Sequence, residues 1–123
     1  MELLVATICL SITAFGILTA IGFADNQNTL SRQRMTALAI ASSAMEGYRS
    51  QAYANNLAPG TYTTSLGSST LPKPAQQIVT ITATSDPVVF NVTVQVNWTV
   101  TLSSGATTRG VHLDTALRNN DVP

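Results

Sequence analysis

Few residues of this chain have the types and spacing that catalysis needs. His112 and Asp114 lie two positions apart in a segment that alternates like a β-strand, so their side chains are expected to share a face. A His–Asp pair catalyses group transfer only beside a nucleophile and a group that stabilises the oxyanion, and nothing in the sequence supplies these. We therefore expect no catalytic residue and a protein that is not an enzyme.

The sequence also has few side chains that could bind a metal ion or a cofactor. One His and one Cys, Cys9, cannot form a multi-ligand Cys/His metal site, and a single Cys cannot close a disulfide within the chain. The carboxylates of Asp86, Asp114 and Asp121 lack the spacing of a calcium-binding loop. We expect neither a metal nor a cofactor.

Charge is scarce and balanced. Six Lys and Arg and six Asp and Glu among 123 residues give a formal net charge of zero. Only 10% of the residues are charged, against about 25% in an average protein. A neutral chain lacks the electrostatic attraction that dominates binding to nucleic acid. No nucleic acid partner is therefore expected.

The remaining carboxylate of interest, Glu2, stands at the edge of an uncharged segment that runs over residues 3–24. A helix of that length covers about 33 Å, enough to cross a bilayer core. The segment exceeds the apolar region of a cleaved secretory signal, and no basic residue precedes it. The sequence therefore predicts a membrane-spanning helix over residues 3–24.

The positions of the first basic residues raise a conflict about the side of the membrane on which the rest of the chain lies. Arg32 and Arg34 follow the segment closely, and the positive-inside rule alone would keep the rest of the chain in the cytoplasm. The Thr-rich second half instead favours export. We expect a basic leader upstream of Met1.

The helical pattern continues beyond the apolar segment. No proline occurs from Met1 to Ala58, and residues 28–54 are rich in helix-favouring side chains. Asn55 and Asn56 are expected to end the helix. Apolar residues at steps of three and four predict one buried stripe. The stripe comprises Leu30, Ala37, Leu38, Ala41, Ala44, Met45, Tyr48 and Ala52, whereas Ser31, Gln33, Ser42, Ser43, Glu46 and Ser50 occupy the polar side.

Strict alternation predicts a sheet in the second half. Even positions from Phe90 to Leu102 are apolar and the odd positions between them are polar, as in a half-buried strand. A shorter strand over residues 79–84 precedes it, and another over residues 107–117 follows it. Residues 59–77 form a connection in which residues 61–66 also fit a short strand. The aromatic rings of Tyr48 and Trp98 are expected in the core.

These elements predict an α+β fold in which one long N-terminal helix packs on an antiparallel sheet of three to four strands. The helix is expected over residues 1–54, a loop over 55–77 and the sheet domain over 78–123. The apolar stripe of the helix is the candidate cover for the apolar face of the sheet.

The first six residues, Met-Glu-Leu-Leu-Val-Ala, resemble the N-termini of type IV pilins and pseudopilins. The predicted long helix and small sheet are similar to the architecture of that family. The family's Glu is normally the fifth residue of the mature chain and here is the second, so we expect about three more residues upstream. The helix-breaking proline and C-terminal disulfide of many members have no counterpart here.

The resemblance implies a structural subunit that polymerises into an extracellular filament, with the apolar helix as core and the β domain as outer surface. Its partners would be many copies of itself, a prepilin peptidase that leaves a methylated N-terminus, and the pilus assembly machinery. It would lie in the inner membrane before assembly and on the cell surface afterwards. Glu2 would pair with the N-terminal amine of a neighbouring subunit. The other implied assembly residues are Leu3, Leu4, Val5, Phe15, Gly16 and Gly22.

Several side chains have two readings. Gly16 and Gly22 would let the helix bend within a bundle or act as small packing positions. Asp25, Arg32 and Arg34 are candidates for contacts between subunits or form a solvated helix face. The hydroxyls of Thr7, Ser11, Thr13 and Thr19 make helix-packing contacts or bond to the backbone.

Two modification signals are also present. Ser68, Ser69 and Thr70 are candidates for O-glycosylation. Asn91 and Asn97 begin N-glycosylation sequons, which arise by chance in Thr-rich strands.

Two other functions stay open. One is a pseudopilin of a type II secretion system, and the other is a membrane-anchored minor pilin that acts as a binding or adhesion module. Binding would need an exposed basic or aromatic patch, and the sheet domain offers only Lys73, Arg109 and Arg118 as basic residues.

Overall fold

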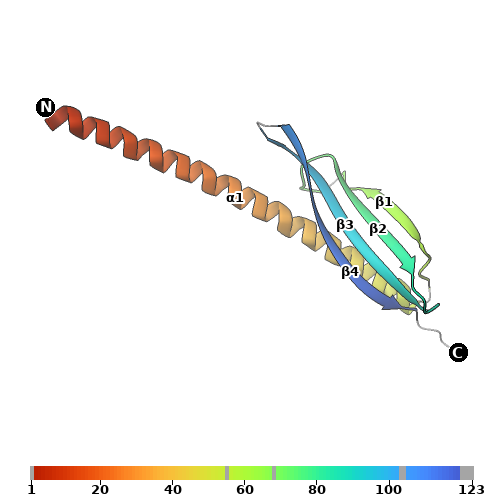
Figure 1. The fold of residues 1–123 in the computed structure, drawn as a ribbon. Helices are drawn as coiled ribbons and strands as arrows, with labels where there is room; N and C mark the ends of the chain where they lie inside the picture. The colour runs from red at the N-terminus through yellow and green to blue at the C-terminus, as the bar shows by residue number, and fades with distance from the viewer. Residues whose placement is uncertain (1, 55, 68, 103–104, 120–123) are drawn as a thin grey trace. The chain divides into compact units, whose positions relative to one another are not determined.

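The structure is a computed structural model that describes residues 2–54, 56–67, 69–102 and 105–119. It contains one helix and four strands in the order α1, β1, β2, β3, β4 (Figure 1). The chain divides into two compact units, one up to Arg32 and one from Gln33 onward. Each unit is described by itself below. The predicted α+β class is confirmed.

Helix α1 extends over Glu2–Tyr53 without a break. Its last turn closes with backbone bonds from Ala54 N to Ser50 O (3.2 Å) and from Asn56 N to Gln51 O (2.9 Å). The helix ends where the sequence predicted, because two asparagines and then Pro59 follow.

The four strands form one antiparallel sheet in chain order, which confirms the predicted meander. Strand β1 covers Gly60–Ser65, β2 covers Ala75–Ala83, β3 covers Val89–Leu102 and β4 covers Gly105–Arg118. The β2–β3 turn is held by Asp86, whose Oδ1 accepts from Val88 N (3.1 Å) and whose backbone oxygen accepts from Val89 N (3.1 Å).

All four strands differ from the sequence-based bounds, β3 and β4 by one or two residues at an end. Strand β1 occupies the segment expected to hold a short strand, and it begins at Gly60 instead of residue 61. Strand β2 begins at Ala75, four residues before the predicted start. The long β3 explains this extension, because Ala75 pairs with Trp98 and Thr99 N donates to Pro74 O (3.1 Å).

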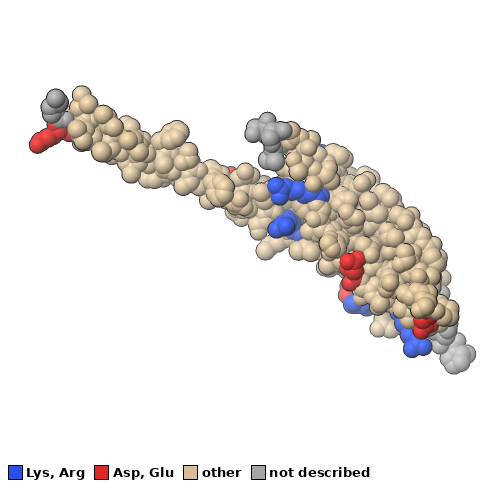
Figure 2. Space-filling view, viewed as in Figure 1, with Lys and Arg blue, Asp and Glu red and all other residues tan. Residues whose placement is uncertain are grey.

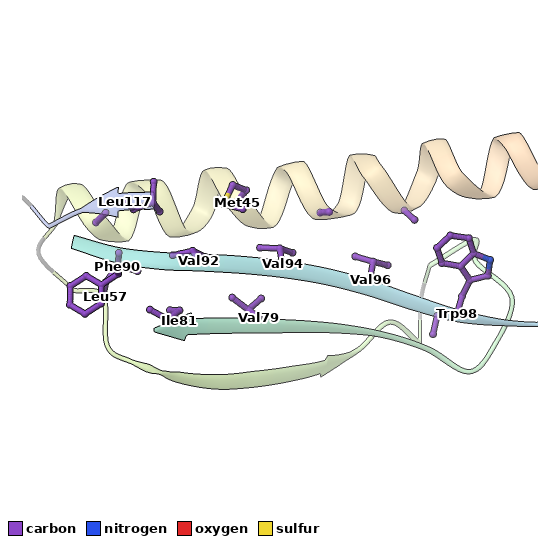
Figure 3. Packing of buried hydrophobic residues seen from close by; sticks show 14 of the residues in the cluster. Met45, Leu57, Val79, Ile81, Phe90, Val92, Val94, Val96, Trp98 and Leu117 are labelled. Carbon is purple, nitrogen blue, oxygen red and sulfur yellow. The ribbon is translucent and has the colours of Figure 1, made fainter. Parts of the chain in front are cut away.

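The core of the second unit lies between α1 and one face of the sheet (Figure 3). Alternation along β3 turns every even side chain from Phe90 to Trp98 inward, as predicted. Three of the four buried helix residues are alanines, Ala37, Ala41 and Ala52, so the backbone of α1 can approach the sheet closely at these positions. The buried apolar residues are Ala37, Ala41, Met45, Ala52, Leu57, Leu71, Ala75, Val79, Ile81, Phe90, Val92, Val94, Val96, Trp98 and Leu117.

One position predicted for the apolar stripe and one predicted for the polar side of the helix are wrong. Leu38 is 42% exposed, because one residue after Ala37 the helix has turned by about 100° away from the sheet. Gln33 was placed on the polar side, yet it lies one turn before Ala37 and is half-buried. Its Oε1 accepts a hydrogen bond from Trp98 Nε1 (3.2 Å).

Tyr48 and Trp98 were expected in the core, and Trp98 is buried while Tyr48 is half-buried. Burial raises the pKa of the Tyr48 phenol, and the neighbouring Tyr62 phenol adds to the rise. Tyr48 and Trp98 therefore both belong to the packing of this unit.

The packing of β3 predicts a large cost for removing volume at its centre. Val94 is fully buried, so Val94→Ala removes two methyl groups and leaves a cavity. We expect the free energy of unfolding of the detergent-solubilised chain to fall by about 2 kcal/mol. Thr93→Ala, on the opposite face, is the matched control and should change it by less than about 0.5 kcal/mol. Denaturant titration followed by Trp98 fluorescence measures both, and equal losses would contradict the inward assignment of Val94.

The bond between Gln33 and Trp98 predicts a second effect. Gln33→Leu keeps the bulk but leaves the indole N–H without its acceptor, so we expect a loss of about 1 kcal/mol of unfolding free energy. Ser42→Leu, on an exposed position of the same helix, should have no comparable effect. A stabilising Gln33→Leu would show that the bond contributes nothing.

Candidate functional site

The most unusual surface is the first unit of α1. Between Leu3 and Ala24 every side chain is exposed, and eleven of them are large and apolar. Figure 2 shows this part of the helix as an almost unbroken uncharged surface. These eleven residues, called here the apolar collar, are Leu3, Leu4, Val5, Ile8, Leu10, Ile12, Phe15, Ile17, Leu18, Ile21 and Phe23.

Every residue of the helix from Leu3 to Ala24 is exposed, so no side of this segment is covered by the described part of the chain. The most apolar window of α1 has a mean hydropathy of 2.3 and no residue buried inside the chain. By length and composition, α1 is able to cross a membrane. A soluble domain rarely exposes so large a contiguous apolar patch, so this surface needs lipid or another protein as its cover.

The polar side chains within this segment are bonded to the helix itself. Thr7 Oγ1 donates to Leu4 O (2.9 Å) and Ser11 Oγ donates to Thr7 O (2.8 Å). Thr13 Oγ1 donates to Cys9 O, and Thr19 Oγ1 donates to Gly16 O (2.9 Å). Of the two readings given for these hydroxyls, the structure shows the bonds to the backbone. As a result they carry no unpaired donor into an apolar environment.

Glu2 opens the helix at one end of the apolar collar. Its side chain is exposed, and a carboxylate in the first turn is favoured by the positive end of the helix dipole. Among the residues that the structure describes, no ion pair includes it. The pairing expected for Glu2 stays a prediction.

The two glycines of the segment leave the helix intact. Gly16 and Gly22 are helical, and a Cβ at either position would meet open space. The helix is therefore continuous in a single chain. Whether either glycine bends it within a bundle stays a prediction.

The charged residues that follow are exposed. Asp25, Arg32 and Arg34 take part in no ion pair with other described residues. Their side chains are therefore available to solvent or to another chain.

The proposed glycosylation sites differ in exposure. Ser69 is half-buried and its Oγ donates to Leu66 O (2.9 Å), whereas Thr70 is exposed. Ser68 lies outside the described residues. Of the two sequon asparagines, Asn91 is exposed, and Asn97 is half-buried with its Oδ1 accepting from Gln95 Nε2 (3.0 Å).

The residues that first suggested catalysis lie on the open face of the sheet. His112 Nε2 and Asp114 Oδ2 are 3.9 Å apart, and both side chains are largely exposed. Within the described part of the chain, no group of three or more His, Cys, Asp or Glu could hold a metal ion. A hollow of about 500 Å³ beside α1 has no titratable side chain in its lining, which consists of Thr36, Ala39, Ile40, Ser43, Ala44 and Gln77.

Sequence reasoning missed two features of the second unit. One is Gln33, whose place on the buried side of the helix could have been found from its position four residues before Ala37, although its contact with Trp98 could not. The other is the close approach of the Asn97 carboxamide to Gly110, which a Cβ at position 110 would prevent. Asn97 and Gly110 lie opposite each other in β3 and β4, so the register of this hairpin is the signal that could have linked these two residues.

Comparison with protein-family models, with curated proteins and with solved structures gives no match to this chain. The architecture is therefore the ground on which function is argued. It is pilin-like: a long N-terminal helix has an exposed apolar first part, and its second part packs on a four-stranded antiparallel sheet.

Proposed function

We propose that this chain is the structural subunit of an extracellular type IV pilus-like filament. The observation that carries the proposal is the apolar collar, whose eleven large apolar side chains are all exposed. Lipid would cover it before assembly, and the helices of other copies would cover it in the filament. The sheet unit would then form the outer surface.

The pattern of hydrogen bonds within the helix supports this exchange of environment. The hydroxyls of Thr7, Ser11, Thr13 and Thr19 are bonded to backbone oxygens, so they need no water in either setting. Helix bundles that exclude both lipid and water associate through close packing of small and apolar side chains. Gly16 and Gly22 would provide the small positions of such a bundle.

Glu2 would set the axial register of the subunits. A carboxylate beside apolar surface is costly to desolvate unless an opposite charge meets it. The N-terminal amine of a neighbouring subunit would supply that charge. Glu2 is suited to this role by its exposure and its place at the end of the apolar collar.

Assembly of this kind is head-to-tail, so one surface of each copy meets a different surface of the next. The partners are many copies of this chain, a prepilin peptidase and the pilus assembly machinery, and the inner membrane holds the subunit before assembly. Asp25, Arg32 and Arg34 would meet other subunits near the end of the collar. The role is structural, with no catalysis, no cofactor and no nucleic acid in it.

The test removes the charge of Glu2 and nothing else. With Glu2→Gln we expect at least a tenfold smaller share of the chain in sheared filaments, because the neighbouring amine loses its partner. Glu46→Gln is the matched control, since Glu46 is an exposed glutamate of the same helix in a surface ion pair with Arg49. Immunoblots of the sheared and membrane fractions measure both variants.

The outcomes separate the alternatives. Equal filament yield from Glu2→Gln and Glu46→Gln would contradict the role of Glu2. A wild-type chain that stays in the membrane without filaments would contradict the structural proposal and leave a secretion pseudopilin or an anchored binding module.

A further inference from the structure

The sheet of the second unit has a long edge on one side. Strand β4 is 14 residues long, is last in the strand order and pairs with β3 alone in the described part of the chain (Figure 1). The opposite edge, β1, is only 6 residues long. The free side of an edge strand presents backbone N–H and C=O groups that can pair with another strand.

Strand β4 lacks most of the usual protection of such an edge. Proteins block edge strands with bulges, prolines, lysines, inward-pointing charges or a short strand length. The pairing of β3 with β4 is unbroken from Val89 opposite Arg118 to Leu102 opposite Gly105, so β4 has no bulge. It contains neither proline nor lysine, and its one inward-pointing charge, Arg109, lies four residues before Leu113. The part of the edge around Leu113 is therefore open to backbone pairing.

Two apolar side chains along this edge are incompletely covered. Val111 and Leu113 lie opposite Val96 and Val94 and share their inward face. Val94 and Val96 are fully buried, whereas Val111 and Leu113 are only half-buried. Another strand beside β4 would cover them and gain hydrophobic stabilisation.

We propose that β4 pairs antiparallel with β4 of a second copy of this chain, about a two-fold axis at Leu113. In this register His112 lies opposite the partner's Asp114, and Asp114 lies opposite the partner's His112. On the inward face Leu113 meets the partner's Leu113, and Val111 meets the partner's Thr115. The edge is thus complementary to itself, because an imidazole can donate a hydrogen bond to the carboxylate opposite it and apolar side chains meet on the inward face.

The neighbouring registers are less favourable. An axis at Asp114 would set two carboxylates opposite each other, which is destabilising. An axis at His112 would set two imidazoles opposite each other and leave Asp114 facing Gly110. An axis at Val111 would lose the pairing of His112 with Asp114, because it sets His112 opposite Gly110 and Asp114 opposite Thr108. Arg109 faces a leucine in both registers, Leu113 with the axis at Val111 and Leu117 with the axis at Leu113. His112 and Asp114 are both largely exposed, so the favoured register can use them without rearrangement.

This pairing goes beyond the proposed function. A two-fold contact is closed and cannot propagate a head-to-tail polymer. It would therefore join subunits of two neighbouring filaments side by side, and it rests on the proposed function only for the place of the second copy.

Cross-linking tests the register. In a Cys9→Ser background, which removes the only cysteine, Leu113→Cys places two cysteines directly opposite each other. Their Cα atoms would be about 4.5–5.5 Å apart, within reach of a disulfide. Thr115→Cys is the matched control, because it is half-buried on the same face but lies about 14 Å from its own copy. Oxidised filaments should give at least tenfold more disulfide-linked dimer from Leu113→Cys than from Thr115→Cys.

Exchange of the charges gives an independent readout. His112→Asp sets like charges opposite each other, and we expect at least a fivefold loss of filament bundles in electron micrographs. Adding Asp114→His exchanges the two charges and should restore bundling. Equal dimer yields from the two cysteine variants, or no recovery in the exchanged variant, would overturn the pairing.

The result also separates this inference from the proposed function. Filaments without the Leu113→Cys dimer would overturn the β4 pairing alone. If no filaments form, the same oxidation is carried out on isolated membranes, where the dimer supports the pairing and its absence refutes it.

Discussion

The first half of α1 has to be kept out of water, and the rest of the proposed biology depends on this constraint. Complete burial of one large apolar side chain is worth about 1.5–3 kcal/mol. The apolar collar has eleven such side chains, all at least half exposed in the isolated chain. Their exposure to water would cost more than the net stability of a typical domain, about 5–15 kcal/mol. The chain therefore needs a bilayer or other copies of itself around this segment.

The second half of the same helix is covered by the sheet of its own chain, and its residues differ accordingly. Ala37 and Ala41 are fully buried and small, so the helix lies close to the even-numbered side chains of β3. Gln33 adds one specific bond to Trp98 at the beginning of this contact. The same helix thus presents large apolar residues where its cover comes from outside the chain, and mostly alanines, together with Met45, where the sheet supplies the cover.

Prediction from sequence succeeded where a short period governs the pattern. The alternation from Phe90 to Leu102 follows the geometry of a strand, so it identified β3 and its inward face without tertiary information. The apolar helix was identified from residues 3–24 because the length of this segment and its lack of charge need no tertiary information either. The early start of β2 was missed, because Ala75 joins the sheet through the length of its neighbour β3 rather than through its own pattern.

In the candidate site, too, local features could be predicted from the sequence, whereas contacts between distant residues could not. The residues of the apolar collar and their exposure could be predicted, since composition alone decides them. The contact of Gln33 with Trp98 joins positions far apart in the chain, and the free edge of β4 follows from strand order, so neither could be predicted from local pattern. The partner of Glu2 belongs to another molecule and cannot be read from one chain.

Cryo-electron microscopy of material sheared from the surface of cells that express this chain tests the central claim most directly. The account predicts continuous fibres in which residues 3–24 of many copies pack together at the axis, with the sheet units outside. Density should also join the Glu2 carboxylate to an amine of a neighbouring copy. Fibres with the sheet units at the axis, or a chain found only as single copies in the membrane, would contradict it.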